Sequence, residues 1–229
     1  QKYIYDKKAH NPIVFNPEFL AQGTAYENMI HPDRVVIGGE KKEALNTLNS
    51  VLNAFSANVI MTSWESAETI KYASNALLAT KVAAINEIAN LCEKTGANIK
   101  EVSKGVGLDH RIGSSFLEAG CGFGGSCFEK DIKALLSLAN KHNVDMNIFS
   151  SVLMSNTRQR LIVVEKLKNE IKDLNKISVA VLGLSFKEDT NDARESVALY
   201  VVNEFMKEGA TVKLYDPEAK MSFVNEYKM

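Results

Sequence analysis

The chain has 229 residues, a formal net charge of −1 and 45% hydrophobic residues, enough apolar material for a substantial core in one or two domains. Lysine and arginine are spread evenly, so we expect no nucleic-acid partner and no binding to an acidic membrane surface. No apolar run reaches the roughly 18 residues of a membrane span, no signal peptide opens the chain, and three cysteines without framework spacing favour a reducing, cytoplasmic location.

The first apolar run, residues 13–15, lies between two prolines and is consistent with a short buried strand. The chain then leaves this strand through a loop that carries Glu18. Because ligands bind at the carboxyl ends of parallel strands, Glu18 is placed to act chemically. A solvated loop glutamate is the alternative interpretation, and these residues taken alone favour it.

Residues 35–39 and 59–62 are predicted strands, and residues 41–55 between them carry apolar side chains at helical spacing. A strand, a helix and a strand in this order indicate part of a parallel sheet. None of the predicted strands is followed by the glycine fingerprint GxGxxG, so the dinucleotide-binding signature is absent from this chain.

The longest predicted helix covers residues 66–95, and Gly96 is its expected C-terminal stop. Its side chains are apolar on most sides, which is typical of a helix in a large core or an interface. Lys71 and Asn75 are four residues apart and share one face, where they could hold a polar ligand. A lysine that extends into solvent from the helix edge is the alternative.

A short helix over residues 99–106 leads into a loop that carries Arg111 toward Phe116. An arginine between glycine turns can bind a phosphate with two parallel hydrogen bonds. A surface salt bridge is the commoner role for such a residue.

The most unusual stretch runs from Gly120 to Asp131, with four glycines in its first six positions. We expect Ser126 to cap the helix that follows, with acidic residues in its first turn. Cys127 would then lie at a helix N-terminus, which favours the thiolate and suggests a catalytic nucleophile in a ligand-wrapping loop. A small buried cysteine in a glycine-rich turn is equally compatible. The spacing of Cys121 and Cys127 does not favour a metal site, and we predict none.

Two more helices and a strand–helix–strand unit are predicted after this loop, over residues 132–142, 148–171, 177–183, 196–209 and 211–216. The unit looks like half of a Rossmann fold, and its charged loop, residues 186–196, could bind a nucleotide. Asp216 mimics a ribose-binding acid, but without the glycine fingerprint it does not indicate a nicotinamide site. Two strands do not complete a doubly wound sheet, so we expect the chain to be cut at both ends.

Six segments in order resemble the UDP-glucose 6-dehydrogenase family of nucleotide-sugar dehydrogenases. They are NPEFLAQGTA from Asn16, HPDRVVIG from His31, AETIKYASNALLA from Ala67, DHRIGSSFL from Asp109, GFGGSCFEKD from Gly122 and LGLSFKEDTNDARES from Leu182. The non-functional alternatives given above for single residues are each reasonable alone, but they become improbable when all six segments match.

The resemblance implies an α/β plus all-α architecture in three parts. Residues 1–64 would be the C-terminal part of an NAD-binding Rossmann domain. Residues 65–175 would form a helical dimerisation domain with a long central helix and a connector helix, and residues 176–229 the start of a UDP-binding Rossmann-like domain. We expect a homodimer, and we expect the fragment alone to be inactive.

The implied reaction is the NAD-dependent four-electron oxidation of UDP-glucose to UDP-glucuronate through a cysteine thiohemiacetal and thioester. By resemblance, Cys127 is the nucleophile. Lys71 stabilises an oxyanion or shuttles a proton, and Asn75 is a hydrogen-bond donor beside it. Glu18 serves as acid and base in thioester hydrolysis, and Asp131 assists a bound water.

The resemblance also implies contacts with both ligands. Those with the sugar nucleotide are Phe19, Leu20, Arg111, Phe116, Glu118, Gly122, Phe123, Gly124, Phe186 and Lys187. Arg111 would reach the neighbouring subunit's site. Gln22 and Arg194 match positions that contact NAD, although Gln22 replaces an acidic residue seen in some relatives.

Other readings stay open. GDP-mannose 6-dehydrogenase shares the glycine loop and the lysine helix, and a UDP-N-acetylmannosamine enzyme ranks third. From another class, the chain could be an inert nucleotide-binding or dimerisation module in which Cys127 does not react.

Overall fold

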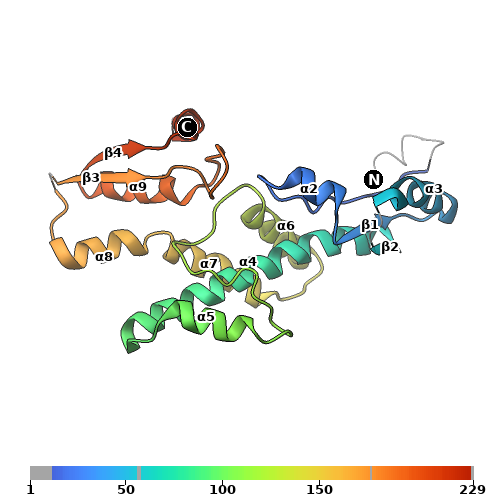
Figure 1. The fold of residues 1–229 in the computed structure, drawn as a ribbon, viewed down its shortest axis with the longest axis horizontal. Coiled ribbons are helices and arrows are strands. Elements are labelled where there is room, and N and C mark those ends of the chain that lie inside the picture. Colours follow the sequence, from blue (N-terminus) through green and yellow to red (C-terminus); the bar gives the residue numbers. More distant parts are fainter. Residues whose placement is uncertain (1–11, 56–57, 176, 228–229) are drawn as a thin grey trace. The chain divides into compact units, whose positions relative to one another are not determined.

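Helix α4, Trp64–Thr95, is the longest element that the computed structural model describes (Figure 1). The structure describes residues 12–55, 58–175 and 177–227. The chain divides within α4 into two units, Gln1–Ser74 and Asn75–Met229. The helix begins where the Ser63 hydroxyl accepts a hydrogen bond from Ser66 N (3.2 Å). It ends before Gly96, which has the expected left-handed backbone (φ 80°).

The first unit is built on a parallel strand pair covered by a helix. Its elements are α2 (Ala25–Ile30), β1 (Arg34–Gly38), α3 (Lys42–Leu52), η1 (Asn53–Phe55), β2 (Asn58–Thr62) and the start of α4. Strands β1 and β2 pair in register at Val36 and Ile60. Val35 and Ile37 of β1 and Leu45 of α3 form the buried core. The predicted strand–helix–strand order of this region is confirmed, whereas α2 was not predicted.

The strand expected over residues 13–15 was wrong. A single antiparallel bridge joins Phe15 to Gly38, through hydrogen bonds of 2.8 and 2.7 Å between their backbone groups. The run is too short for a ladder because Pro12 and Pro17 on either side have no N–H to donate. Glu18 therefore does not follow a parallel strand. Its loop is tied to β1 by Asn16 Nδ2, which donates to Val36 O (2.7 Å).

The second unit continues from α4 into a set of helices. These are α5 (Ile99–Gly107), α6 (Phe128–Lys141), α7 (Asn147–Gln159) and α8 (Ile162–Ile171). The prediction of a single connector helix over residues 148–171 was wrong, because the helix is interrupted at Arg160 and Leu161. There Leu161 N bonds to Arg158 O, three residues back, and α8 starts afresh. The break coincides with a buried arginine, Arg160, that bonds away from its own helix.

The second unit ends in another parallel pair, formed by β3 (Ser178–Leu182) and β4 (Thr211–Tyr215) with α9 (Val197–Lys207) between them in sequence. Ser196 caps α9 by accepting a hydrogen bond from Ala198 N (3.2 Å). One apolar cluster joins α9 to α8, and another joins it to α10 (Lys220–Tyr227). The expected α/β plus helical fold class is confirmed.

Asp216, which follows β4, binds backbone groups of its own chain. Its carboxylate accepts hydrogen bonds from the backbone N–H groups of Leu184 (2.7 Å), Ser185, Glu218 and Ala219 (2.6 Å). Desolvation would raise the pKa of Asp216, but these four donors outweigh it and lower the pKa. The residue therefore fixes the turns after β3 and β4, which agrees with its exclusion as a nicotinamide-site residue.

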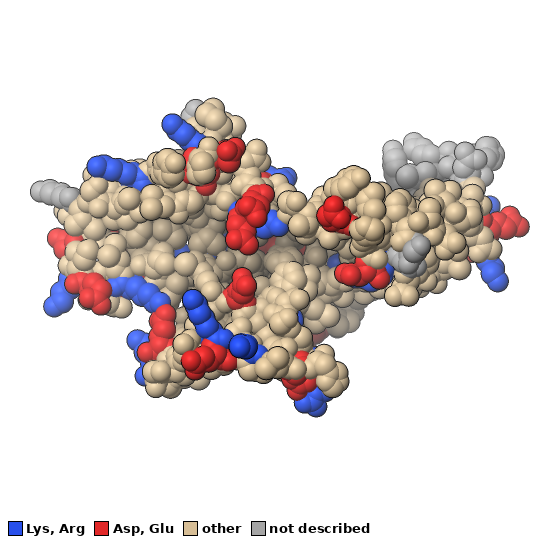
Figure 2. All heavy atoms as spheres, viewed as in Figure 1, with Lys and Arg blue, Asp and Glu red and all other residues tan. Residues whose placement is uncertain are grey.

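Charged side chains of both signs are interspersed over the face drawn in Figure 2, and the described residues on that face form no large patch of one sign. Within the described ranges, no helix is both long enough and apolar enough to span a membrane. A search of the same residues for three His, Cys, Asp or Glu side chains placed to hold a metal ion finds no such group.

Gly38 provides a test of the packing in the first unit. A Cβ added there would lie 2.5 Å from Ala67 Cβ and 2.9 Å from Ser63 O, and a backbone oxygen has little room to move. We expect Gly38→Ala to lower the free energy of unfolding by about 1–3 kcal/mol, measured by urea denaturation.

Gly105 is the matched control, because it lies in helix α5 and nothing is within 4 Å of an added Cβ. Gly105→Ala should stabilise the protein by about 0.5–1 kcal/mol. Equal effects of the two substitutions would contradict the close approach of β1 to α4.

Candidate active site

The glycine loop, residues 120–127, is held by buried amide side chains from two helices. Asn156 of α7 accepts a hydrogen bond from Phe123 N (2.8 Å) and donates one to Phe123 O (3.0 Å). Gly120 N donates to Asn86 of α4 (2.7 Å), and Gln159 of α7 donates to Gly120 O (2.7 Å). These contacts replace the backbone pairing that a loop lacks, so the loop has a defined conformation.

Two glycines of this loop are required by close contacts with the charged loop after β3. A Cβ at Gly124 would lie 2.4 Å from Glu195 O. Gly125 has a left-handed backbone (φ 82°), and a Cβ there would lie 2.8 Å from the Phe186 ring. The structure therefore brings Phe186 against the glycine loop, two features that the sequence separates by about 60 residues.

Cys127 is the exposed thiol of the three cysteines. It occupies the N-cap position of α6, and its carbonyl accepts the first helical hydrogen bond, from Asp131 N (2.9 Å). The prediction that Ser126 caps this helix was wrong by one residue, because the Ser126 hydroxyl lies instead 3.9 Å from the Cys127 sulfur. Burial raises the pKa of the Cys121 thiol, and Cys92 is buried, so neither is a comparable nucleophile.

Asp131 lies one turn after Cys127 and is 1% exposed. One carboxylate oxygen accepts a hydrogen bond from Asn75 Nδ2 (2.5 Å), and the other accepts one from Lys130 Nζ (2.5 Å). A buried carboxylate is tolerated when its oxygens are paired in this way. Two of the predicted catalytic residues, Asn75 and Asp131, are therefore in direct contact.

In the first unit, Lys71 and Glu18 form a second predicted pair. Lys71 Nζ donates to Glu18 Oε1 (3.1 Å) and to Glu18 O (2.6 Å), while Leu20 N donates to Glu18 Oε2 (2.7 Å). The Lys71 side chain is only 18% exposed, so it does not extend into solvent as the alternative interpretation held. Phe19 lies under two cations, with Arg34 3.9 Å and Lys71 5.4 Å from its ring centroid.

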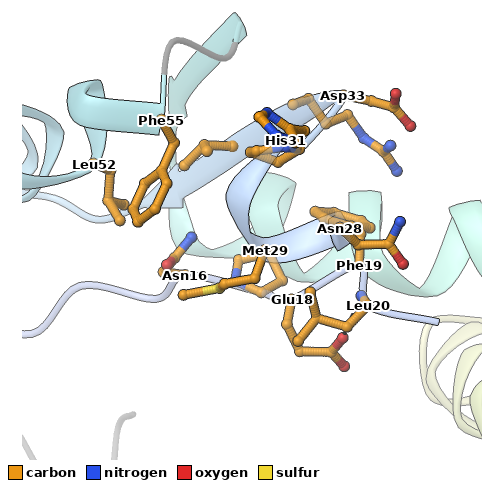
Figure 3. A pocket seen from close by; sticks show the side chains of 14 residues that line it. Asn16, Glu18, Phe19, Leu20, Asn28, Met29, His31, Asp33, Leu52 and Phe55 are labelled. Atoms are coloured by element: carbon orange, nitrogen blue, oxygen red, sulfur yellow. Dashed lines mark hydrogen bonds between the residues drawn. The ribbon is translucent and has the colours of Figure 1, made fainter. Parts of the chain in front are cut away.

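A cavity of about 150 Å³ lies beside this pair, within the first unit. Glu18, Phe19 and Leu20 border it, and Figure 3 shows Leu52 and Phe55 reaching it from the neighbouring helical segment. Sites for drug-sized ligands usually measure about 300–1,000 Å³. This cavity alone is therefore too small for a nucleotide sugar.

The other predicted substrate residues are more dispersed. Arg111 is exposed and bonds to Asp109, with its Nη2 2.6 Å from Asp109 Oδ2, and these bonds lower the pKa of Asp109. Phe116 has a strained left-handed backbone (φ 63°), and its ring centroid is 6.3 Å from that of Phe128. Glu118 and Lys187 are exposed.

The residues predicted to contact NAD fit a dinucleotide only in part. Arg194 forms two-point hydrogen bonds with Asp192 (2.6 Å for the shortest), and Asp192 and, more weakly, Cys127 raise the pKa of Arg194. Its half-exposed guanidinium thus lies within electrostatic reach of Cys127, which suits an anionic cofactor. Gln22 is exposed.

Sequence reasoning missed Asn86, Asn156, Gln159 and Arg160 as residues that support the site. The signal in the sequence was a cluster of polar side chains, residues 156–160, at the end of a helix whose buried residues also include Val152. Such residues are usually solvated, and only their burial in the fold shows that they bind backbone groups.

Glu129, in the first turn of α6, gives a prediction about acid stability. Partial burial would raise the pKa of Glu129, but hydrogen bonds and charges from Lys133 (2.6 Å) and Arg160 (2.9 Å) lower it overall. A lowered pKa in the folded state stabilises the protein above the ordinary glutamate pKa of about 4.3, and this stabilisation is lost as pH falls through the folded-state value.

We expect Glu129→Gln to be less stable than the wild type at pH 7 by about 1–3 kcal/mol, and the difference to shrink at about pH 4 and below. Urea denaturation at several pH values measures it. Glu93→Gln, which removes a half-exposed pair with Lys166, is the control and should change little. A stability difference for Glu129→Gln that stays constant with pH would contradict the assignment.

Comparisons with known proteins give the family of the chain. Three domain models of the UDP-glucose/GDP-mannose dehydrogenase family match in order: the NAD binding domain at residues 2–56, the central domain at 65–158 and the UDP binding domain at 180–229. The UDP-glucose 6-dehydrogenase of Rickettsia bellii (strain RML369-C) is 44% identical over 232 residues, 98% of this chain and 54% of that protein. TuaD, the UDP-glucose 6-dehydrogenase of Bacillus subtilis (strain 168), is 45% identical over 90% of this chain and 45% of its own length.

Among solved structures, a UDP-glucose dehydrogenase from the archaeon Pyrobaculum islandicum matches with a TM-score of 0.91 and 37% identity. The match covers 93% of this chain and 50% of that one. The chain thus spans about half the length of the relatives it matches. Because all three domain models of one family match in their order along most of its length, the chain belongs to the UDP-glucose/GDP-mannose dehydrogenase family.

Proposed function

We propose that the whole protein oxidises UDP-glucose to UDP-glucuronate, with two molecules of NAD+ in succession each accepting one hydride. The observation that carries this proposal is Cys127, an exposed thiol at the start of α6, one turn before the buried Asp131. The names of the relatives support UDP-glucose as the substrate, and the family match at residues 180–229 supports a UDP group. We also propose the domain boundaries given above, after residues 64 and 175.

In the proposed reaction, the C6 alcohol loses a hydride and a proton and becomes an aldehyde. The Cys127 thiolate then adds to the aldehyde carbon, a C–S bond forms, and the former aldehyde oxygen takes up a proton to give a thiohemiacetal. Loss of the second hydride and of the hydroxyl proton leaves a thioester. Water attacks the carbonyl carbon of the thioester and the C–S bond breaks. The Cys127 thiolate is the leaving group, and the carboxylate product is released.

The chain's own residues support these steps from their observed contacts. In the second unit, Asn75 donates to Asp131, which gives Asp131 a fixed carboxylate that can orient a water beside Cys127. In the first unit, Lys71 is a half-buried cation suited to a developing oxyanion, and its partner Glu18 is exposed and suited to proton transfer in hydrolysis. Phe186, which lies against Gly125, is suited to stack on uracil.

The homodimer and the service of Arg111 to a neighbouring subunit remain part of this proposal. Helix α4 supports a dimer because two of its leucines, Leu77 and Leu91, are 59% and 62% exposed within one chain. Sedimentation of the protein decides the oligomeric state, and a monomer at micromolar concentration would exclude the dimer.

The stoichiometry of the reaction tests the function. With limiting UDP-glucose and excess NAD+, the whole protein should form two NADH per sugar nucleotide. Cys127→Ser should lower product formation at least about 10³-fold, because a serine hydroxyl is a far weaker nucleophile at neutral pH. Cys92→Ser is the matched control and should keep activity where it folds.

One NADH per sugar would contradict the thioester role of Cys127. Turnover of GDP-mannose or UDP-N-acetylmannosamine in place of UDP-glucose would replace the proposed substrate. Binding of UDP without any turnover would favour the inert nucleotide-binding module.

A further inference from the structure

Arg160 is a buried arginine that takes no part in the proposed chemistry. It lies at the end of α7 and is only 3% exposed. Its Nε and Nη2 donate to Phe123 O (3.3 and 3.0 Å), and Nη2 also donates to Glu129 Oε2 (2.9 Å). Phe123 precedes Cys127 by four residues and Glu129 follows it by two. The guanidinium therefore binds the Phe123 backbone on one side of the thiol and the Glu129 carboxylate on the other.

A third contact joins Arg160 to the strand–helix–strand unit at the end of the chain. The guanidinium carbon lies 4.2 Å from the centroid of the Tyr200 ring in α9. Tyr200 donates a hydrogen bond to the Glu195 carboxylate. The backbone oxygen of the same residue, Glu195 O, leaves no room for a Cβ at Gly124. One side chain thus contacts the glycine loop, α6 and α9.

Asn156, one turn before Arg160, completes the attachment by bonding to both backbone groups of Phe123. A buried cation is costly unless it is paired, and the contacts of Arg160 Nε and Nη2 use the fork geometry of the planar guanidinium. A lysine in its place has one nitrogen and reaches Phe123 O or Glu129, not both with the same geometry.

We propose that Arg160 is a positioning residue, which sets the placement of the Cys127 thiol by fixing the segment Phe123–Glu129 at both ends. This inference rests on the proposed function only for its kinetic consequence. The placement of the thiol itself is independent of the substrate.

The test compares Arg160→Lys with Arg158→Lys in the whole protein. Arg158 lies on the same helix, but its side chain is 69% exposed and 3.8 Å from Glu87, so it is the matched control. Iodoacetamide labelling followed by peptide mass spectrometry gives the alkylation rate of each cysteine, with Cys92 and Cys121 as internal references.

For Arg160→Lys we expect the alkylation rate of Cys127 to fall about tenfold. We expect kcat to fall about 10–100-fold and KM for UDP-glucose to stay within about threefold of the wild type, because misplacing a reacting group acts mainly on the chemical step. Arg158→Lys should leave both rates unchanged. If Arg160→Lys does not fold, Glu129→Gln removes one of the two ends and should give a smaller loss of the alkylation rate.

Wild-type alkylation and kcat in a folded Arg160→Lys protein would overturn the proposal. An equal change in reactivity at all three cysteines would overturn it too, because it would mean a general loss of stability. A wild-type protein that does not oxidise UDP-glucose would refute the proposed function, and the alkylation rates would still decide the role of Arg160.

Discussion

The candidate site depends on how the backbone of a glycine loop is held. Four glycines let the loop run close to other chain segments, and the same freedom would leave it without a fixed conformation. In the folded protein, buried amide and guanidinium groups bind the backbone of Gly120 and Phe123 and so fix the loop. A net hydrogen bond contributes about 1 kcal/mol, and a charge-assisted one about twice that, so the set offsets part of the conformational entropy lost when the loop is ordered.

Helix α6 starts directly after Cys127. Because Gly125 is fixed between Arg194 O and the Phe186 ring, α6 begins after Cys127 and not after Ser126. The thiol is left exposed at the positive end of the helix, with the buried Asp131 on the next turn. Packing in the second unit thus accompanies the exposure of Cys127, and it links the glycine loop to the loop carrying Phe186.

Local patterns predict the parts of this fold that local forces determine. The strand–helix–strand order of residues 34–62 follows from apolar runs and helical spacing, and the end of α4 follows from Gly96. The patterns fail where distant contacts decide. The run at residues 13–15 makes only one bridge, and the helix expected over residues 148–171 breaks where Arg160 turns to bind Phe123 and Glu129.

In the candidate site too, contacts between residues distant in sequence could not be predicted from local patterns. Asn75 and Asp131 are 56 residues apart, and Glu18 and Lys71 are 53 apart, so no local spacing could pair them. The resemblance to a family selected all four residues, but it gave no contacts between them. It also did not select Asn86, Asn156 or Gln159, whose polar character alone is typical of a solvated surface and whose role becomes visible only when they are buried.

The central claim is that Cys127 carries the oxidised sugar as a covalent intermediate. The most direct measurement is mass spectrometry of the whole protein after acid quenching during turnover of UDP-glucose, with Glu18→Gln used to slow hydrolysis. The account predicts an added mass equal to the uridine diphosphate uronyl group on the peptide that contains Cys127. An unmodified Cys127 in a variant that still consumes one NAD+ or more per site would contradict it.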